Sequence, residues 1–311
     1  MKKSFQKSLI AASVGAVMFA AVGTASANSL LFPYFSTAAG AQSVLSLSNT
    51  GTAPATQTIH YVYNYGAACT HFDANGSLTA NDILSHSIAA PATTTSPGAG
   101  GFGKVVGTDT SVPVYFPLAN QTGFLVVSSK STASVDALRG SMAIIDTNTG
   151  LVVSYPGIDN ALATNAPANE GNYAAITDVN FPLTALPAGI VSTSWFAAVI
   201  GDMSGPIGLG QDWKGTGTFT NNGNIWNNDE VPFSGTQTKT VVCQGTVQPN
   251  DLATAAQIGA VGTNGGLVKA TLGTLLNGAT GVIMTKIQTV LPAVGAPFAG
   301  KQFLHREQAG L

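Results

Sequence analysis

The side chains best suited to chemistry gather shortly after the first cysteine. His71, Asp73, Asn75, Asp82 and His86 lie close together in the sequence. Carboxylate and amide oxygens are the ligands that Ca²⁺ takes in proteins. This pattern predicts a calcium site formed by Asp73, Asn75 and Asp82, with a transition-metal site using His71 and His86 as an alternative. A third interpretation is a plain turn in which Asp73 caps backbone amides.

A second group combines aromatic rings with an acidic residue. Trp213 and Trp226 lie in a segment rich in Gly, Asn and Asp, and Asp229 follows the second tryptophan. Tryptophan has a large apolar body with a polar tip, which suits stacking on the apolar face of a sugar. These three residues therefore form a predicted ligand-binding site for a glycan. The alternative is that both tryptophans belong to the core, where they are most often buried.

The chain contains two cysteines, Cys69 and Cys243, far apart in the sequence. In an exported protein such a pair is expected to form a disulfide. There is no C-x-x-C motif and no cluster of ligands of the kind that redox and zinc sites need. The predicted bond closes a loop over most of the chain and contributes about 5 kcal/mol in the chain-entropy model.

No motif of a known type of active site is found. The chain contains neither a G-x-S-x-G nucleophile elbow nor an H-E-x-x-H zinc motif. We therefore predict no catalytic residues and no cofactor, with the calcium considered above as the alternative. An enzyme is the least supported class of function.

The first 27 residues have the three parts of a secretory signal. Lys2 and Lys3 give a positive start, residues 9-22 are apolar, and Ala25 and Ala27 frame a small-residue cleavage site. We predict a signal peptide over residues 1-27, which is removed before Asn28. The mature protein is then exported to the periplasm, the cell surface or the medium.

Short runs of alternating or β-branched residues, separated by turn residues, recur along the mature chain and indicate strands. They cover residues 42-49, 58-65, 123-129, 141-155, 190-200, 236-243, 266-276 and 280-291. No long segment has a helical period. The pattern predicts an all-β fold, an antiparallel, jelly-roll-like β-sandwich with few short helices.

The turns between these runs predict which strands pair. T-N-T-G within residues 141-155 predicts a hairpin. Residues 42-49 are expected to pair with residues 58-65, and residues 266-276 with residues 280-291 across an Asn-Gly turn. No linker stands out, so residues 28-311 are predicted to form a single domain with a loose tail from about residue 301.

The composition narrows the range of partners. Charged residues make up 8% of the chain and the formal net charge is −2, against about 25% charged residues in ordinary soluble proteins. Such a chain lacks the basic patch that nucleic-acid binding requires. No stretch of the mature chain is long and apolar enough for a transmembrane helix. Weak surface charge also gives little protection against self-association.

The mature N-terminus carries the one resemblance to known proteins. It begins L-L-F-P-Y-F and continues into an alternating strand and N-T-G. This opening resembles uncharacterised exported proteins of Gram-negative bacteria. The resemblance implies export but no activity. We expect the opening segment to be a buried first strand, and the alternative is a strand that inserts into the sheet of a neighbouring subunit.

Three functional hypotheses remain. The first is an exported structural or interaction protein of the bacterial cell surface, which could assemble with itself or bind other surface proteins. The second is a carbohydrate-binding module, with a glycan as its partner. The third is an outer-membrane β-barrel, although its strands should be longer and more evenly alternating than these.

Overall fold

The computed structural model describes most of the predicted mature chain. The described residues are 29-50, 56-88, 116-129, 138-146, 151-159, 171, 173, 180-185, 187, 191-203, 213-221, 223, 225-257, 259, 265-290 and 302-307. The predicted signal peptide, residues 1-27, lies outside them. None of the helices within the described residues is long and apolar enough to span a bilayer.

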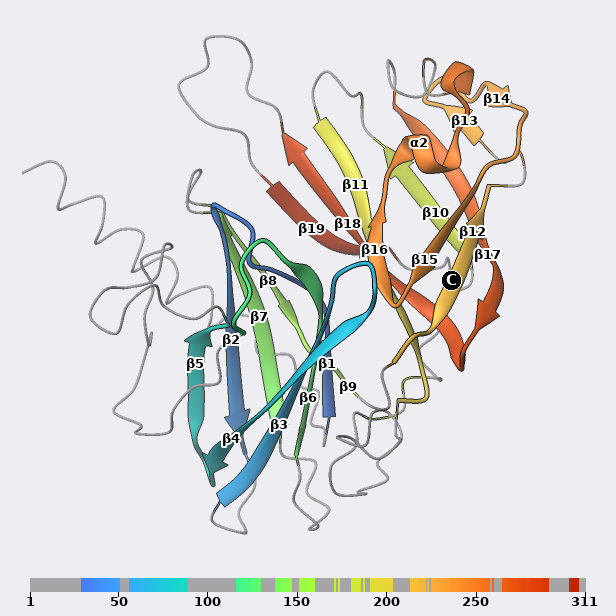
Figure 1. Ribbon diagram of the computed structural model, residues 1–311. Helices are drawn as coiled ribbons and strands as arrows, with labels where there is room; N and C mark the ends of the chain where they lie inside the picture. The colour runs from blue at the N-terminus through green and yellow to red at the C-terminus, as the bar shows by residue number, and fades with distance from the viewer. Residues whose placement is uncertain are drawn as a thin grey trace, which may run out of the picture. The chain divides into compact units, whose positions relative to one another are not determined.

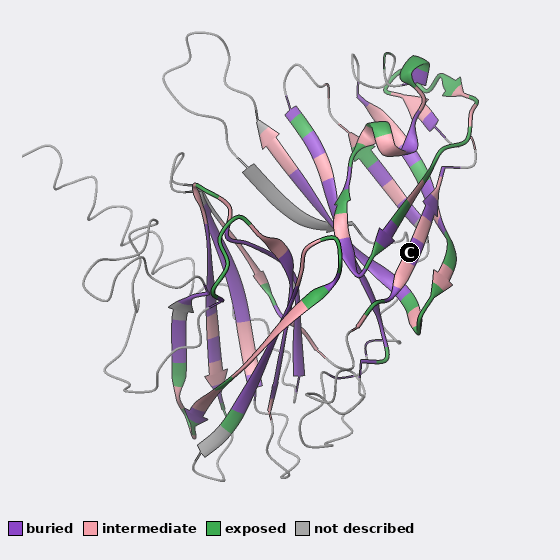
Figure 2. Cartoon of the chain, viewed as in Figure 1, coloured by how far each residue is buried: buried purple, intermediate pink, exposed green. Residues whose placement is uncertain are grey.

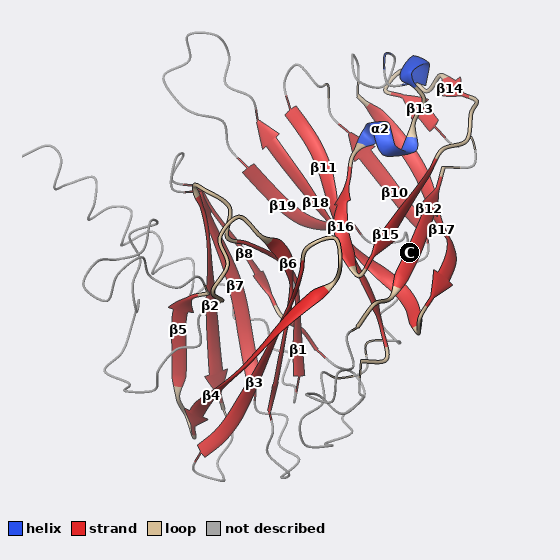
Figure 3. Cartoon of the chain, viewed as in Figure 1, coloured by secondary structure: helices blue, strands red, loops and turns tan. Residues whose placement is uncertain are grey.

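The described residues form antiparallel strands almost throughout (Figure 3), with two short helical segments. The prediction of an all-β, antiparallel fold with few short helices is confirmed. The chain divides into two compact units, each assembled from segments distant in the sequence. Unit 1 comprises residues 1-63, 71-171 and 204-211, and unit 2 the rest. The single domain over residues 28-311 stays a prediction.

Unit 1 contains two antiparallel sheets (Figure 1). The first has the order β4-β3-β6-β1-β9, formed by Thr70–Thr79, Thr56–Tyr65, Thr122–Ser129, Ser29–Ser36 and Ile158–Asp159. The second has the order β5-β2-β7-β8, formed by Ile83–Ser87, Ala41–Asn49, Leu138–Asp146 and Leu151–Pro156. The predicted hairpin within residues 141-155 is confirmed, because β7 pairs with β8 from Ser141 to Asp146.

The core of unit 1 is built around its first strand. Every residue of β1 is buried, and the strand pairs with β6 on one side and β9 on the other. The register with β6 shifts between Phe32 and Phe35, around Pro33, which has no N–H to give to a ladder. Phe35 also makes edge contacts with the rings of Tyr63 and Phe116. The expectation of a buried first strand is therefore confirmed.

Unit 2 also contains two antiparallel sheets. In the larger one, β17 (Gly266–Leu276) pairs with β10 (Asn180–Ala185) on one side and with β12 (Thr216–Thr220) and β13 (Ile225–Asn227) on the other. The outer strands are β14 (Pro232–Phe233), which pairs with β13, and β15 (Thr238–Val242), which pairs with β12. The smaller sheet has the order β16-β11-β18-β19, formed by Gln244–Val247, Val191–Gly201, Ala279–Val290 and Gln302–Glu307.

The six strands of the larger sheet occupy four positions side by side, because two of these positions are each filled by two short strands in succession. β12 and β13 follow each other along the same edge of β17, opposite residues 271-276 and 266-268. β14 and β15 continue along the far side of that interrupted strand. Buried residues of both sheets form one core cluster, which includes Phe181, Phe219, Trp195 and Met284. One face of each sheet is therefore turned toward this cluster and the other away from it.

The largest buried side chain of this core gives a direct test of its packing. Trp195 on β11 is fully buried, and its indole N–H has no hydrogen-bond partner within the described residues. Trp195→Ala is expected to lower the free energy of unfolding by about 3 to 5 kcal/mol, because it leaves a large cavity. Trp195→Phe should cost far less, because it keeps an aromatic ring and removes an unsatisfied donor. Urea unfolding of both variants checks this, and equal losses would contradict it.

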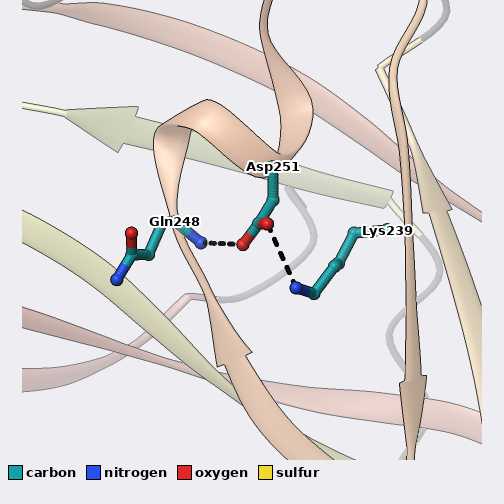
Figure 4. Close-up of polar contacts among 3 residues, drawn as sticks. All are labelled: Lys239, Gln248 and Asp251. Atoms are coloured by element: carbon teal, nitrogen blue, oxygen red, sulfur yellow. Dashed lines mark hydrogen bonds and ion pairs between the residues drawn. The ribbon is translucent and has the colours of Figure 1, made fainter.

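A short helix completes this core. Helix α2 (Pro249–Leu252) contributes the buried Leu252. Asp251 accepts hydrogen bonds from the backbone N–H of Gln248 at 2.9 Å and from Lys239 Nζ at 3.0 Å (Figure 4). Lys239 is on β15 directly opposite Phe219. The one lysine of β15 is therefore directed toward α2, on the core side of the sheet.

Two predicted strand pairings are wrong. β17 and β18 occur where expected, joined by the Asn277-Gly278 turn with positive φ at both residues, but they lie in different sheets. Likewise β2 pairs with β5 and β7, whereas β3 lies in the other sheet of unit 1. At the Asn277-Gly278 turn, where the sequence suggested a hairpin, the chain crosses between two sheets whose buried residues share one core.

The C-terminal tail was also mispredicted. Residues from about 301 were expected to be loose, but Gln302–Glu307 forms β19, which pairs with β18 from Met284 to Thr289. Strand pairing is made by backbone groups, so a polar segment can join a sheet when a neighbouring edge is open.

Candidate functional site

The predicted disulfide between Cys69 and Cys243 is confirmed, and it lies within unit 2. The Cα atoms are 5.3 Å apart, and the two residues are separated by 174 positions in the sequence. Cys69 ends the turn between β3 and β4, and Cys243 lies between β15 and β16. The bond therefore joins the tip of one hairpin to a break between two later strands.

Backbone hydrogen bonds hold both cysteines in place. The N–H of Cys69 bonds the carbonyl of Gly66, and Gln244 Nε2 donates to that same carbonyl at 2.8 Å. The N–H of Cys243 donates to the carbonyl of Gly215, and the carbonyl of Cys243 accepts from the N–H of Val199 at 2.8 Å. Both cysteines have positive φ, 55° and 59°. Because this backbone region is disfavoured for residues with a Cβ, the turn geometry is maintained by these surrounding contacts.

The three residues predicted to bind calcium do not come together. Asp73 lies near the start of β4, whereas Asp82 follows its end and accepts hydrogen bonds from the N–H groups of Thr79 and Ile83. A strand rises ~3.4 Å per residue, so ~20 Å separate the Cα atoms of Asp73 and Thr79. Ligands of one Ca²⁺ lie within ~2.6 Å of the ion. The geometry contradicts a shared site, and Asp82 instead caps the turn after β4.

Asp73 has partners of its own on the same hairpin. Its carboxylate oxygens lie 3.1 Å from His71 Nε2 and 3.8 Å from His60 Nε2. Asn75, farther along β4, is exposed. Within the described residues, no group of three or more His, Cys, Asp and Glu side chains is arranged to hold a metal ion. Asp73 therefore lies within hydrogen-bond distance of the His71 imidazole, whereas His60 Nε2 is too far away for a hydrogen bond.

Trp213 is packed into its own unit rather than displayed for a ligand. Its indole N–H donates to the carbonyl of Val199 at 2.9 Å. The ring packs closely on two glycines: a Cβ added to Gly201 would lie 2.8 Å from a ring carbon of Trp213, and one added to Gly215 would lie 2.6 Å from another. Trp213 also lies beside the disulfide, since Cys69 Sγ contacts its carbonyl oxygen. These contacts assign the half-buried indole a structural role, contrary to the predicted sugar site.

The glycines around Trp213 offer a test of this packing. In Gly201→Ala the new Cβ would lie 2.4 Å from the carbonyl oxygen of Gly278, and backbone atoms cannot easily move away. We expect a loss of about 3 kcal/mol in the free energy of unfolding. Gly273→Ala is the matched control in a strand, because its Cβ would meet only the carbonyl of Thr218, at 3.5 Å. Thermal unfolding that shows the same shift for both variants would contradict this account.

Trp226 and Asp229 lie at a different place from Trp213. Trp226 on β13 pairs with Leu267 at the start of β17, while Trp213 packs beyond the other end of β17. About 30 Å of strand separate the two ends. Asp229 is exposed in the turn after β13, where its N–H bonds Asn227 Oδ1. Half-exposed Trp226 is the one predicted stacking residue that remains available, with Lys269 Nζ 5.0 Å from its ring centroid.

A feature that sequence reasoning missed lies on the same sheet as Trp226. The face turned away from the core carries hydroxyl side chains in register on three strands. Thr220 lies between Thr271 and Thr238, and Thr218 lies opposite Thr240, with their Oγ1 atoms 3.2 Å apart. The next row places Thr216 between Leu276 and Val242. We call this set the threonine face; it comprises Thr216, Thr218, Thr220, Thr238, Thr240, Val242, Thr271 and Leu276.

The threonine face is partly exposed and nearly uncharged. Thr238 and Thr240 are exposed, and two large aliphatic side chains, Val242 and Leu276, are 37% and 53% exposed. Along β12 these residues alternate with buried ones, and within β15 and β17 their neighbours are buried or half-buried (Figure 2). Among the described strand residues of this sheet, Lys269 is the one charged side chain on this face. Ordinary soluble proteins contain about 25% charged residues, so a face with one charged side chain among its described strand residues is unusually neutral.

A signal for this face was present in the sequence. T-G-T-F-T at residues 216-220 and T-K-T at residues 238-240 both place threonine at every second position. In a strand that spacing puts the hydroxyls on one face. The rows could not be predicted because they depend on which strands pair.

No protein-family model, curated protein or solved structure matches the chain.

Proposed function

We propose that this chain is an exported structural or interaction protein of the bacterial cell surface, and that the threonine face is its contact surface. The observation that carries the proposal is the threonine face itself. It is a sheet face with aligned hydroxyls, two exposed aliphatic side chains and, among the described strand residues of the sheet, a single charge, Lys269. Exposed apolar side chains among neutral polar ones are typical of recognition surfaces.

The disulfide and the leader sequence support the exported location. Disulfides persist in oxidising compartments and are rare in the cytosol. The formed Cys69–Cys243 bond fits export through the predicted signal peptide. The low charge of the whole chain, 8%, also fits a role in contacts between neutral surfaces.

Fractionation of the native host tests this function. The expected result is a protein in the envelope or medium that begins at Asn28 by mass spectrometry and has no alkylatable thiol. Whole-cell labelling with an impermeant reagent should then reach it at the surface. A cytosolic chain with an intact leader and two free thiols would overturn the proposal.

A further inference from the structure

We infer that the threonine face binds a neutral polysaccharide chain laid along its strands. This inference rests on the proposed function and names the partner of the same surface. Neighbouring strands are ~4.8 Å apart and alternate residues ~6.8 Å apart, so the hydroxyls of β12 and β15 stand in regular rows, to which Thr271 adds one on β17. Each hydroxyl both donates and accepts hydrogen bonds. A ligand that presents rows of hydroxyls can therefore replace the water on this face bond for bond.

The charge of the face selects a neutral ligand. Lys269 is the one cation on this face among the described strand residues, and its ammonium lies over the ring of Trp226. Lys239, the other lysine on these strands, is bonded to Asp251 on the core side. Anionic polymers are held by several cations together. The threonine face does not offer several cations together, so nucleic acids and acidic glycans are poor ligands for it.

The area of the face favours a single chain over a second protein. β12, β15 and β17 together span ~10 Å between their axes, and residues 216-220 extend ~14 Å. Even when the face is extended to Trp226, it covers on the order of 400 Å². A stable protein interface buries about 800 Å² on each partner. A narrow linear ligand can bind to this surface because it does not need the ~800 Å² that a protein partner would bury.

The two ends of the extended face add apolar contacts. Trp226 lies at one end, opposite Leu267, and Val242 and Leu276 lie at the other, on either side of Thr216. Sugar rings have apolar faces as well as hydroxyl edges, and aromatic and aliphatic side chains cover such faces. The order of these groups along the strands therefore matches a ligand with repeating apolar and polar surface.

The inference is tested by pull-down of the purified, oxidised mature protein with microcrystalline cellulose and with chitin, both neutral, and with heparin-agarose as the anionic comparison. We expect retention on a neutral polysaccharide and none on heparin. The variant Thr218→Val/Thr240→Val keeps the β-branched shape and removes two hydroxyls. It should bind about tenfold more weakly.

Thr246→Val is the matched control, because Thr246 is an exposed threonine on β16 in the other sheet. It should bind like the wild type, and circular dichroism should show that both variants fold. The inference is overturned if neither neutral polysaccharide retains the protein, if heparin retains it equally, or if Thr218→Val/Thr240→Val binds normally. Sedimentation that shows a dimer lost in that variant would identify a second copy as the partner instead. None of these outcomes changes where fractionation finds the protein, so the two proposals fail separately.

Discussion

Replacing both cysteines with serine is expected to lower the free energy of unfolding by about 5 kcal/mol. The bond between Cys69 and Cys243 joins residues 174 positions apart, and the chain-entropy model predicts a larger effect for a longer closed loop. A single domain is typically stable by 5 to 15 kcal/mol, so the loss would be a large part of the total. Urea unfolding with and without reductant measures it.

The backbone conformation of the two cysteines supplies a matched control. Both have positive φ, which glycine adopts without the penalty that a Cβ brings. Cys69→Gly/Cys243→Gly also lacks the disulfide, but should be about 2 kcal/mol more stable than Cys69→Ala/Cys243→Ala. If the glycine variant were less stable than the alanine variant, positive φ at residues 69 and 243 would not be a source of strain. If the serine pair unfolded like the wild type, the disulfide would contribute nothing.

Raising the pH above 10 is expected to unfold the protein steeply. Four tyrosines of unit 1, Tyr34, Tyr61, Tyr63 and Tyr155, have raised pKa values, and burial of the hydroxyl is the main cause in each. The folded state therefore keeps these protons while the unfolded chain releases them. Their contribution to stability is fully present below pH ~10 and is lost as the pH rises above it. At pH 11 the loss is about 1.4 kcal/mol for each tyrosine whose folded-state pKa lies well above 11, or about 4 kcal/mol for Tyr61, Tyr63 and Tyr155 together.

Absorbance at the tyrosinate band and circular dichroism, followed together from pH 9 to 11.5, check this expectation. Tyrosine ionisation and loss of structure should coincide. Tyr63→Phe is the control, because Tyr63 is fully buried and its hydroxyl has no partner within the described residues. The variant should be no less stable at pH 7 and should lose about 1.4 kcal/mol less at pH 11. If all four tyrosines ionised near pH 10 while the circular dichroism stayed unchanged, their hydroxyls would not be buried.

The strands were easier to predict from the sequence than their partners. Alternating or short apolar runs located β6, β11, β15, β17 and β18 to within a few residues, because side-chain pattern is a local property. Pairing is not local. The Asn277-Gly278 turn has positive φ at both residues, as a hairpin turn requires, yet it joins two sheets across the core of unit 2. A two-residue turn signal cannot distinguish a pair within one layer from a crossing between layers.

The same limit applies to the candidate sites. Asp73 and Asp82 are close in sequence, but an extended strand carries them apart, and Trp213 is drawn into contacts with three glycines. In contrast, Thr218 and Thr240 lie opposite each other although β13 and β14 lie between them in the sequence. Sites that depend on register become visible only when the partner strands are known. The disulfide was predictable because two cysteines allow one intramolecular pairing.

That single pairing has a consequence for biogenesis. If the chain is exported as proposed, it emerges from its N-terminus, and Cys69 then reaches the oxidising compartment well before Cys243. During that interval its thiol is a nucleophile with no native partner, open to mixed disulfides with small thiols or with other chains. Once Cys243 follows, every bond within the chain is the correct one. Maturation therefore calls for an oxidant and time, but not for an isomerase.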